Sequence, residues 1–274
     1  MSGYFKQEHE KDRRKRKENW ELAIGLQQVD NLVPSEYLIE AAKQNIQGEI
    51  SYEKVHQLLY SRYGHGAKED KADKRQMECD IVSARISDYL SNSSFTLSPE
   101  TFRSIHEFLF KDIYDSAGKY RKYNLKKKEP VLGGRSVVYA DFRSIITLLD
   151  YDFKEEKEFS YRQVKDKKGI LKRIAVFSSN IWQVHPFMEG NTRTTALFME
   201  CYLNAMGFHL DNQFFAENVK YFRNALVRAN YADFSQGIYA EPSYLQAFYE
   251  NLLFQGTHKL KNRDLIISEC LERE

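Results

Sequence analysis

Two apolar helical patterns are separated by one polar segment, residues 185–193, with the sequence HPFMEGNTR. The residues before it that recur at helical spacing, and so predict a helix buried on one face, are Ile170, Ile174, Phe177 and Ile181. Pro186 disfavours helix at the residue before it, so the first helix should end there. A second pattern runs from Arg193 to Met206, with Gly207 as a C-terminal cap. The chain must therefore form two core helices joined by a tight polar loop.

The residue types in this loop suit the binding and transfer of phosphate. His185 can take a proton near neutral pH, and Glu189 is an oxygen ligand suited to Mg²⁺. Gly190 lets the backbone approach a phosphate, Arg193 can bind its oxygens through a planar fork, and a helix N-terminus favours anions. Any one of these residues alone would fit a capped helix–loop–helix with a polar loop. Their combination predicts phosphate chemistry on a nucleotide.

The segment resembles the signature of Fic-domain proteins, H-P-F-x-(D/E)-G-N-(G)-R-x-x-(R), most of which transfer AMP from ATP to a hydroxyl of a target protein. The resemblance implies that His185 deprotonates that hydroxyl and that Phe187 packs in the core. It implies that Glu189 holds Mg²⁺ or Mn²⁺ on the nucleotide and that Arg193 stabilises the phosphate charge during catalysis. The nucleotide-binding residues it implies in this loop are Glu189, Gly190, Asn191, Thr192 and Arg193.

Two positions depart from the commonest form of this signature. Thr192 stands where glycine is usual, although its backbone N–H can still donate to an anion. Ala196 stands where the second arginine is usual. In the family that arginine contacts the γ-phosphate and pairs with an inhibitory glutamate, so its replacement puts both functions in question.

The resemblance extends over roughly residues 75–255. The mix of Gly133-Gly134 with β-branched residues predicts a hairpin over Val131–Tyr139, which resembles the Fic flap that clamps a target chain by strand addition. An ordinary surface hairpin is the alternative. Residues 221–231 resemble the segment that lines the family's adenine and ribose pocket, with plain helix core as the alternative. The further nucleotide-binding residues predicted from these two segments are Leu132, Gly133, Gly134, Arg135, Tyr221, Phe222 and Asn230.

Residues 1–65 predict a separate small helical domain. One helical pattern covers residues 20–31, a second begins after Ser35 and ends at Gly48, and a third runs from Ser51 to Gly64. This order resembles the small antitoxin that inhibits one class of Fic proteins. The family's inhibitory motif is (S/T)-x-x-x-E-(G/N), and residues 26–31 match it only at Asn31 and, one methylene short, at Asp30. A plain packing helix is the alternative.

Composition excludes several other classes. Charged residues make up 29% of the chain, and the formal net charge of +2 excludes a strongly basic nucleic-acid binder. Three dispersed cysteines, Cys79, Cys201 and Cys270, show no metal spacing and indicate a reducing compartment. A charged N-terminus without an apolar run predicts no secretory signal, and no stretch approaches a membrane span. We therefore expect a cytoplasmic protein that is not bound to a membrane.

Together these patterns predict an all-α Fic fold with a β-hairpin flap over residues 75–255. A helical antitoxin-like segment, 1–65, should precede it, and a polar tail, 256–274, should follow it. The expected activity is AMP transfer from MgATP to a Ser, Thr or Tyr hydroxyl of a protein held by the flap, with self-modification included. The alternatives are transfer of another phosphate group and a non-catalytic nucleotide-sensing module. A homodimer is left open.

Overall fold

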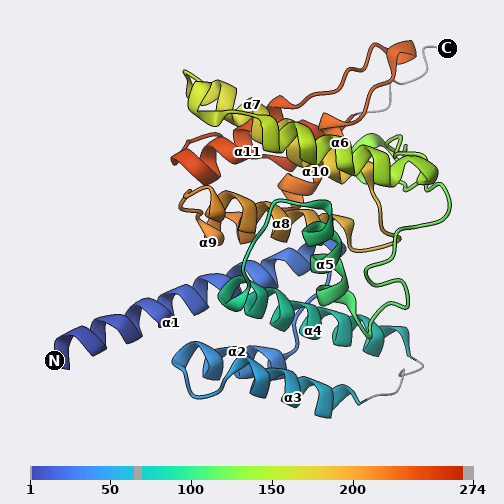
Figure 1. The fold of residues 1–274 in the computed structure, drawn as a ribbon. Coiled ribbons are helices and arrows are strands. Elements are labelled where there is room, and N and C mark those ends of the chain that lie inside the picture. Colours follow the sequence, from blue (N-terminus) through green and yellow to red (C-terminus); the bar gives the residue numbers. More distant parts are fainter. Residues whose placement is uncertain (1, 65–69, 268–274) are drawn as a thin grey trace. The chain divides into compact units, whose positions relative to one another are not determined.

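A computed structural model describes residues 2–64 and 70–267, and the side chains from residue 10 onward. The chain folds into two compact units. The first contains the chain up to Phe95 together with Glu107–Ala117 and Asp211–Val219; the second contains Thr96–His106, Gly118–Leu210 and the chain from Lys220 onward. All regular elements within the described residues are helices, so the predicted all-α class is confirmed (Figure 1).

The first unit is organised around the long helix α1 (Ser2–Gly25). Figure 1 labels the elements that α1 contacts: α2 (Glu36–Gln47), α4 (Lys71–Asn92) and α9 (Asn212–Glu217). α3 (Tyr52–Tyr63) packs on α2 and α4, and the short 3-10 helix η1 (Leu26–Asp30) follows α1 directly. The approach of α1 to α9 depends on Gly25, because a Cβ there would lie 2.5 Å from the Cβ of Ala216.

The starts predicted for α2 and α3 are confirmed by their caps, whereas the single helix predicted over residues 20–31 is divided between the end of α1 and η1. The Ser35 hydroxyl accepts the Leu38 N–H at 3.0 Å, and the Ser51 hydroxyl accepts the Lys54 N–H at 3.2 Å. Each bond satisfies one of the four N–H groups that a helix start leaves unpaired. Gly48 ends α2 in the left-handed conformation, at φ 80°.

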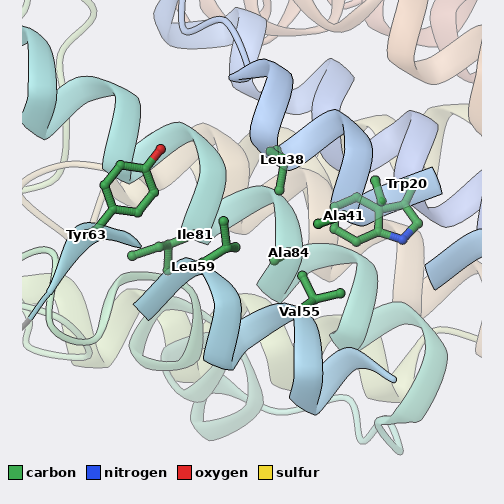
Figure 2. Close-up of a cluster of buried hydrophobic side chains, with 9 residues drawn as sticks. Trp20, Leu38, Ala41, Val55, Leu59, Tyr63, Ile81 and Ala84 are labelled. Atoms are coloured by element: carbon green, nitrogen blue, oxygen red, sulfur yellow. The ribbon is translucent and has the colours of Figure 1, made fainter. Parts of the chain in front are cut away.

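One apolar cluster joins these helices (Figure 2). Its buried members are Trp20, Leu38, Ala41, Ala42, Val55, Leu59, Tyr63, Ile81 and Ala84. A fully buried carboxylate, Asp80 on α4, adds polar bonds: it accepts from the backbone N–H and hydroxyl of Ser35, from the Tyr63 hydroxyl and from the Gln76 amide. The compact unit thus continues past residue 65 into α4, while a separate regulatory domain over residues 1–65 stays a prediction.

The second unit is a helical bundle centred on α7 (Lys167–Val184). α7 contacts α6 (Ile145–Glu158), α8 (Asn191–Ala205) and α11 (Ser243–Phe254), as Figure 1 shows. α5 (Pro99–Phe110) contributes its first part to this unit, and most of α10 (Val219–Ala229) belongs here as well. Aromatic rings packed edge to face fill the core: Phe102, Phe153, Phe177 and Phe198.

The tail beyond residue 256 docks on the second unit. Its 3-10 helix η6 (Asn262–Leu265) buries Leu265 completely. The Ile267 N–H donates to the Val131 carbonyl at 2.9 Å, and Arg228 Nη1 donates to the Leu265 carbonyl at 3.0 Å. The tail therefore contacts the segment that was expected to form the flap.

That flap segment is not a β-hairpin in this structure. Pro130–Leu132 form a 3-10 turn, η2, and residues 133–141 continue without a strand. The reason lies in Glu129, whose N–H donates to the Arg135 carbonyl at 2.9 Å and whose carbonyl accepts the Gly134 N–H at 3.0 Å. These bonds close a compact loop around Pro130 instead of a two-stranded ladder. The predicted β-hairpin is therefore wrong for the described segment.

None of the described helices is both long enough and apolar enough to cross a membrane. Cys79 is buried and Cys201 is partly buried, and Cys270 lies outside the described residues.

Candidate active site

The predicted helix–loop–helix is confirmed around residues 185–193. α7 ends at Val184, and His185 caps it in the left-handed conformation, at φ 49° and ψ 56°. A non-glycine residue there costs about 1–3 kcal/mol, which the surroundings must offset. Gly190, at φ 75°, then turns the chain into α8. The loop thus presents its polar residues at the N-terminus of a buried helix, where unpaired N–H groups favour an anion.

Arg121 holds the loop in this conformation. Its backbone N–H donates to the Pro186 carbonyl at 2.8 Å, and its Nε donates to the His185 carbonyl at 2.8 Å. Its remaining guanidinium nitrogens donate to the carbonyls of Tyr123, Ala140 and Val184. Because this guanidinium is buried and occupied by carbonyls, Arg121 is a positioning residue and not a phosphate ligand.

Phe187 and Asn191 fix the middle of the loop. The Asn191 side chain accepts the Phe187 N–H at 2.9 Å and donates to the Phe187 carbonyl at 2.8 Å. The Phe187 ring is fully buried against Phe102 and His106, as the sequence predicted for a core residue. The Asn191 amide is therefore used within the loop, and its backbone N–H belongs to the start of α8.

His185 is a buried, neutral imidazole without a hydrogen-bond partner. The residue is 3% exposed, and within the described chain neither ring nitrogen meets a donor or acceptor. Burial lowers its pKa well below the ordinary value, and the nearby cations Lys127, Arg121 and Arg223 lower it further. A buried polar atom without a partner marks a place where one is missing. A hydroxyl placed there could give its proton to this ring.

Glu189 has a carboxylate that a metal ion can reach. Its side chain is 61% exposed and pairs with Lys127 Nζ at 3.0 Å. Within the described residues no three His, Cys, Asp or Glu side chains gather into a metal cluster. One carboxylate next to a phosphate site nevertheless fits Mg²⁺, which commonly binds through one or two carboxylates plus substrate phosphates and waters. Glu189 would hold the ion, which would neutralise phosphate charge when bound.

Arg193 and the two unusual positions lie on the buried face of α8. Arg193 is 1% exposed, one turn into the helix, and Ala196 is completely buried. The Thr192 hydroxyl accepts the Trp182 indole N–H at 2.9 Å. Glycine could not make this bond, so Thr192 joins α7 to α8 while its backbone N–H remains part of the helix start.

His106 contacts the loop of the candidate site, and the sequence analysis did not identify it as a site residue. Its Nδ1 accepts the Gly118 N–H at 2.9 Å, and its Nε2 donates to the Glu189 carbonyl at 3.1 Å. The ring stacks on Phe187 with centroids 3.7 Å apart. Burial lowers its pKa to about 4, which matches a neutral ring with its proton on Nε2. His106 therefore positions Glu189. A lone histidine on an apolar helix carries no motif that would have singled it out.

Comparisons with known proteins agree with this geometry. Residues 96–203 match the Fic/DOC family. This part of the chain is a Fic domain. A probable protein adenylyltransferase, y4lH, of Sinorhizobium fredii (strain NBRC 101917 / NGR234) is 24% identical over 128 residues. That match covers 47% of this chain and 62% of the relative, so it spans less than two thirds of the curated protein.

Two solved structures show the same fold. The N-terminal Fic domain of Bep8, a VirB-translocated effector protein of Bartonella sp. 1-1C, is 15% identical with a TM-score of 0.53, covering 68% of this chain and 87% of its own. The corresponding domain of a Bep effector from Bartonella sp. AR 15-3 is 16% identical with a TM-score of 0.55, covering 74% and 88%. At these identities the likeness establishes the fold alone.

The segment from Glu129 to Arg135 contains two charged residues, one at each end. The buried Glu129 carboxylate pairs with Arg223 Nη1 at 2.7 Å and accepts from the Tyr139 hydroxyl at 3.2 Å. Arg135 Nη1 is buried without a hydrogen-bond partner in the described chain. The turn's own residues are the completely buried Leu132 and two glycines with positive φ, Gly133 and Gly134. Their role in nucleotide binding stays a prediction, with Arg135 the most suitable group among them.

The residues predicted for the adenine pocket on and just after α10 pack within the second unit. Phe222 is fully buried against Phe248 and Tyr249 of α11, and Tyr221 is also buried. The Asn230 amide donates to the Ser179 hydroxyl at 2.9 Å. In this structure these side chains hold α10 against α7 and α11. Their contact with a nucleotide stays a prediction.

Asp30 and Asn31, the inhibitory-like pair, lie in the first unit. Asn31 ends η1 in the left-handed conformation, at φ 54°. Arg75 of α4 donates to the Asp30 carbonyl at 2.9 Å and to the Asn31 carbonyl at 3.4 Å. Arg223 pairs with Glu129, and Arg228 donates to the Leu265 carbonyl, both within the second unit. An inhibitory role for Asp30 stays a prediction.

Proposed function

We propose that this Fic domain transfers AMP from MgATP to a Ser, Thr or Tyr hydroxyl of a protein. The observation that carries the proposal is the His185 imidazole, buried and neutral with both nitrogens unpaired, on a loop that ends at a helix N-terminus. A protein that only bound nucleotide would have no use for such a base. The adenylyltransferase name of the Sinorhizobium relative supports the same reaction.

In the proposed reaction the target hydroxyl oxygen attacks the α-phosphorus of ATP. The new P–O bond forms as the bond to the pyrophosphate breaks, and pyrophosphate leaves with its electron pair. His185 takes the hydroxyl proton on a ring nitrogen. General-base help of this kind is worth roughly 10²–10⁴-fold in rate.

The remaining loop residues position and stabilise charge. The N–H groups at the start of α8 and the Arg193 guanidinium would face the phosphates, since both favour anions. Glu189 would hold Mg²⁺ or Mn²⁺, which would neutralise phosphate charge when bound. Little covalent chemistry is left for the protein in such transfers, so placement and electrostatics supply most of the acceleration.

The experiment that tests this function uses ATP labelled either at the α- or at the γ-phosphate. The full chain is incubated with Mg²⁺ and each nucleotide, alone for self-modification and with a cell extract for targets. AMP transfer puts only the α-label on protein. Protein labelled from the γ-position instead would show phosphate transfer, and nucleotide binding without either label would show a non-catalytic module.

A further inference from the structure

Lys127 lies in the candidate active site, although no motif included it. Its Nζ is 3.0 Å from Glu189 Oε2, and its side chain is only 28% exposed, against 61% for Glu189. Its backbone N–H donates to the Ser136 hydroxyl at 3.1 Å, which fixes the chain beside it. The neighbouring Lys126 and Lys128 are exposed. The Lys127 side chain is thus held next to the predicted metal ligand, Glu189.

The charge of Lys127 reaches the reacting centre. After burial, Lys127 is the largest cause that lowers the pKa of His185, ahead of Arg121 and Arg223. Those two arginines are held by groups of the fold itself, Arg121 by backbone carbonyls and Arg223 by the buried Glu129. The partner of Lys127 is different, because it is the carboxylate that a divalent cation would take.

We propose that Lys127 binds the polyphosphate of the nucleotide, and that its pair with Glu189 is a resting contact exchanged on loading of the site. The inference rests on the proposed function. When a divalent cation occupies Glu189, its charge repels the ammonium, and the adjacent phosphate oxygens attract it. Lysine binds phosphate as a point charge with three rotatable donors, so a small movement of Nζ is sufficient.

The composition of the loop explains why such a cation is needed. Residue 196, in the second turn of α8, is a completely buried alanine. This position therefore offers no charge to the phosphates. Arg193 alone would face a triphosphate carrying several negative charges. Lys127, whose ammonium lies 3.0 Å from Glu189 Oε2, would add a second positive charge beside that carboxylate.

The test measures binding and not activity. Titration calorimetry with ATP, inorganic tripolyphosphate and adenosine, each with Mg²⁺, is carried out on the wild type and on Lys127→Met. Lys126→Met and Lys128→Met are matched controls, since they remove the same charge from exposed neighbours. Loss of a charged hydrogen bond should weaken ATP and tripolyphosphate binding about tenfold or more in Lys127→Met alone, with adenosine binding unchanged and with Lys127→Arg near the wild type.

Equal ATP affinity in Lys127→Met, Lys126→Met and the wild type would overturn the inference and leave Lys127 as a plain surface ion pair. An equal loss of ATP affinity in all three methionine variants would also overturn the inference, because the loss would then come from the lower net positive charge and not from a contact of Lys127. If the wild type itself bound neither ATP nor tripolyphosphate, the proposed function would fall and this inference with it. Thermal melts of each variant check that the fold is kept.

Discussion

The Tyr139 ring covers the imidazole of His185, with centroids 4.0 Å apart and planes 30° from parallel. Trp182 meets the same imidazole edge to face at 5.5 Å. The candidate base therefore packs against two aromatic rings, which contribute to the burial that lowers its pKa. The Tyr139 hydroxyl is directed to Glu129, so the residue also connects the base to the buried Glu129–Arg223 pair.

Removing the Tyr139 ring should raise the pKa of His185 toward its ordinary value. Tyr139→Ala lets water reach the imidazole and so reduces the desolvation that disfavours its charged form. Tyr139→Phe keeps the stacked ring and should leave the pKa low. An NMR titration of the histidine ring signals, with His185→Ala to assign the resonance, measures both. A pKa in Tyr139→Ala as low as in the wild type would show that other groups enclose the base.

His106 should make stability depend on pH in mildly acidic solution. Its pKa falls from 6.5 to about 4 on folding, so below pH 6.5 the unfolded chain binds a proton that the folded chain does not. The stability from the neutral ring is present above pH 6.5 and is lost as the pH falls toward 4. Between pH 7 and pH 5 this loss is worth about 2 kcal/mol.

His106→Phe keeps the stacking on Phe187 and removes the titration. Denaturant unfolding at pH 7 and pH 5 gives the free energy of unfolding of each protein. The decrease between the two pH values should be smaller in the variant than in the wild type by about 2 kcal/mol. His185 is present in both proteins and cancels in the comparison. If the stability of the wild type and of His106→Phe depended on pH in the same way, His106 would not be a buried, neutral imidazole.

Arg193 should matter more to transfer than any other arginine of the chain. It is buried at the start of α8, and alanine at position 196 supplies no second charge. Arg193→Ala should cost on the order of 2–4 kcal/mol of transition-state stabilisation, as for a comparable electrostatic donor. Rates of α-label incorporation measure this, with the exposed Arg162→Ala as control. A fall of about threefold or less in Arg193→Ala would mean that another cation compensates.

Sequence patterns located the helices because their signals are local. The caps Ser35 and Ser51 and the break at Pro186 each act within a few residues, and all appear in the structure where they were predicted. The same holds for the buried ring of Phe187. Spacing and residue type are sufficient for such features, since the bonds involved span three or four residues.

The parts that sequence missed either have an ambiguous local signal or depend on distant partners. Gly133-Gly134 between β-branched residues fits a hairpin and a compact loop equally well, and the choice was made by backbone bonds to Glu129. His106 bonds to the Gly118 N–H and to the carbonyl of Glu189, and Glu189 is 83 positions away from it in the chain. Such contacts exist only once the helices have packed, so no local pattern announces them.

We expect the N-terminal segment to be a weak brake or none. Leu26 and Ala196 lack the hydroxyl and the cation that the inhibitory arrangement in the Fic family requires. Arg75 donates to the backbone carbonyls of Asp30 and Asn31, and Asp30→Ala keeps those two bonds. Self-labelling by this variant should stay within about threefold of the wild type. A tenfold rise on Asp30→Ala would reveal a working lock with a different partner.

The most direct measurement compares wild type and His185→Ala with ATP labelled at the α-phosphate, while calorimetry records ATP binding on the same preparations. Loss of the base should lower labelling by roughly 10²–10⁴-fold, because proton removal from the attacking hydroxyl loses its acceptor. ATP affinity should change little, since the proposed phosphate-binding groups are Arg193, the start of α8 and a metal ion at Glu189, none of which the substitution removes. Labelling by His185→Ala at the wild-type rate would contradict the account.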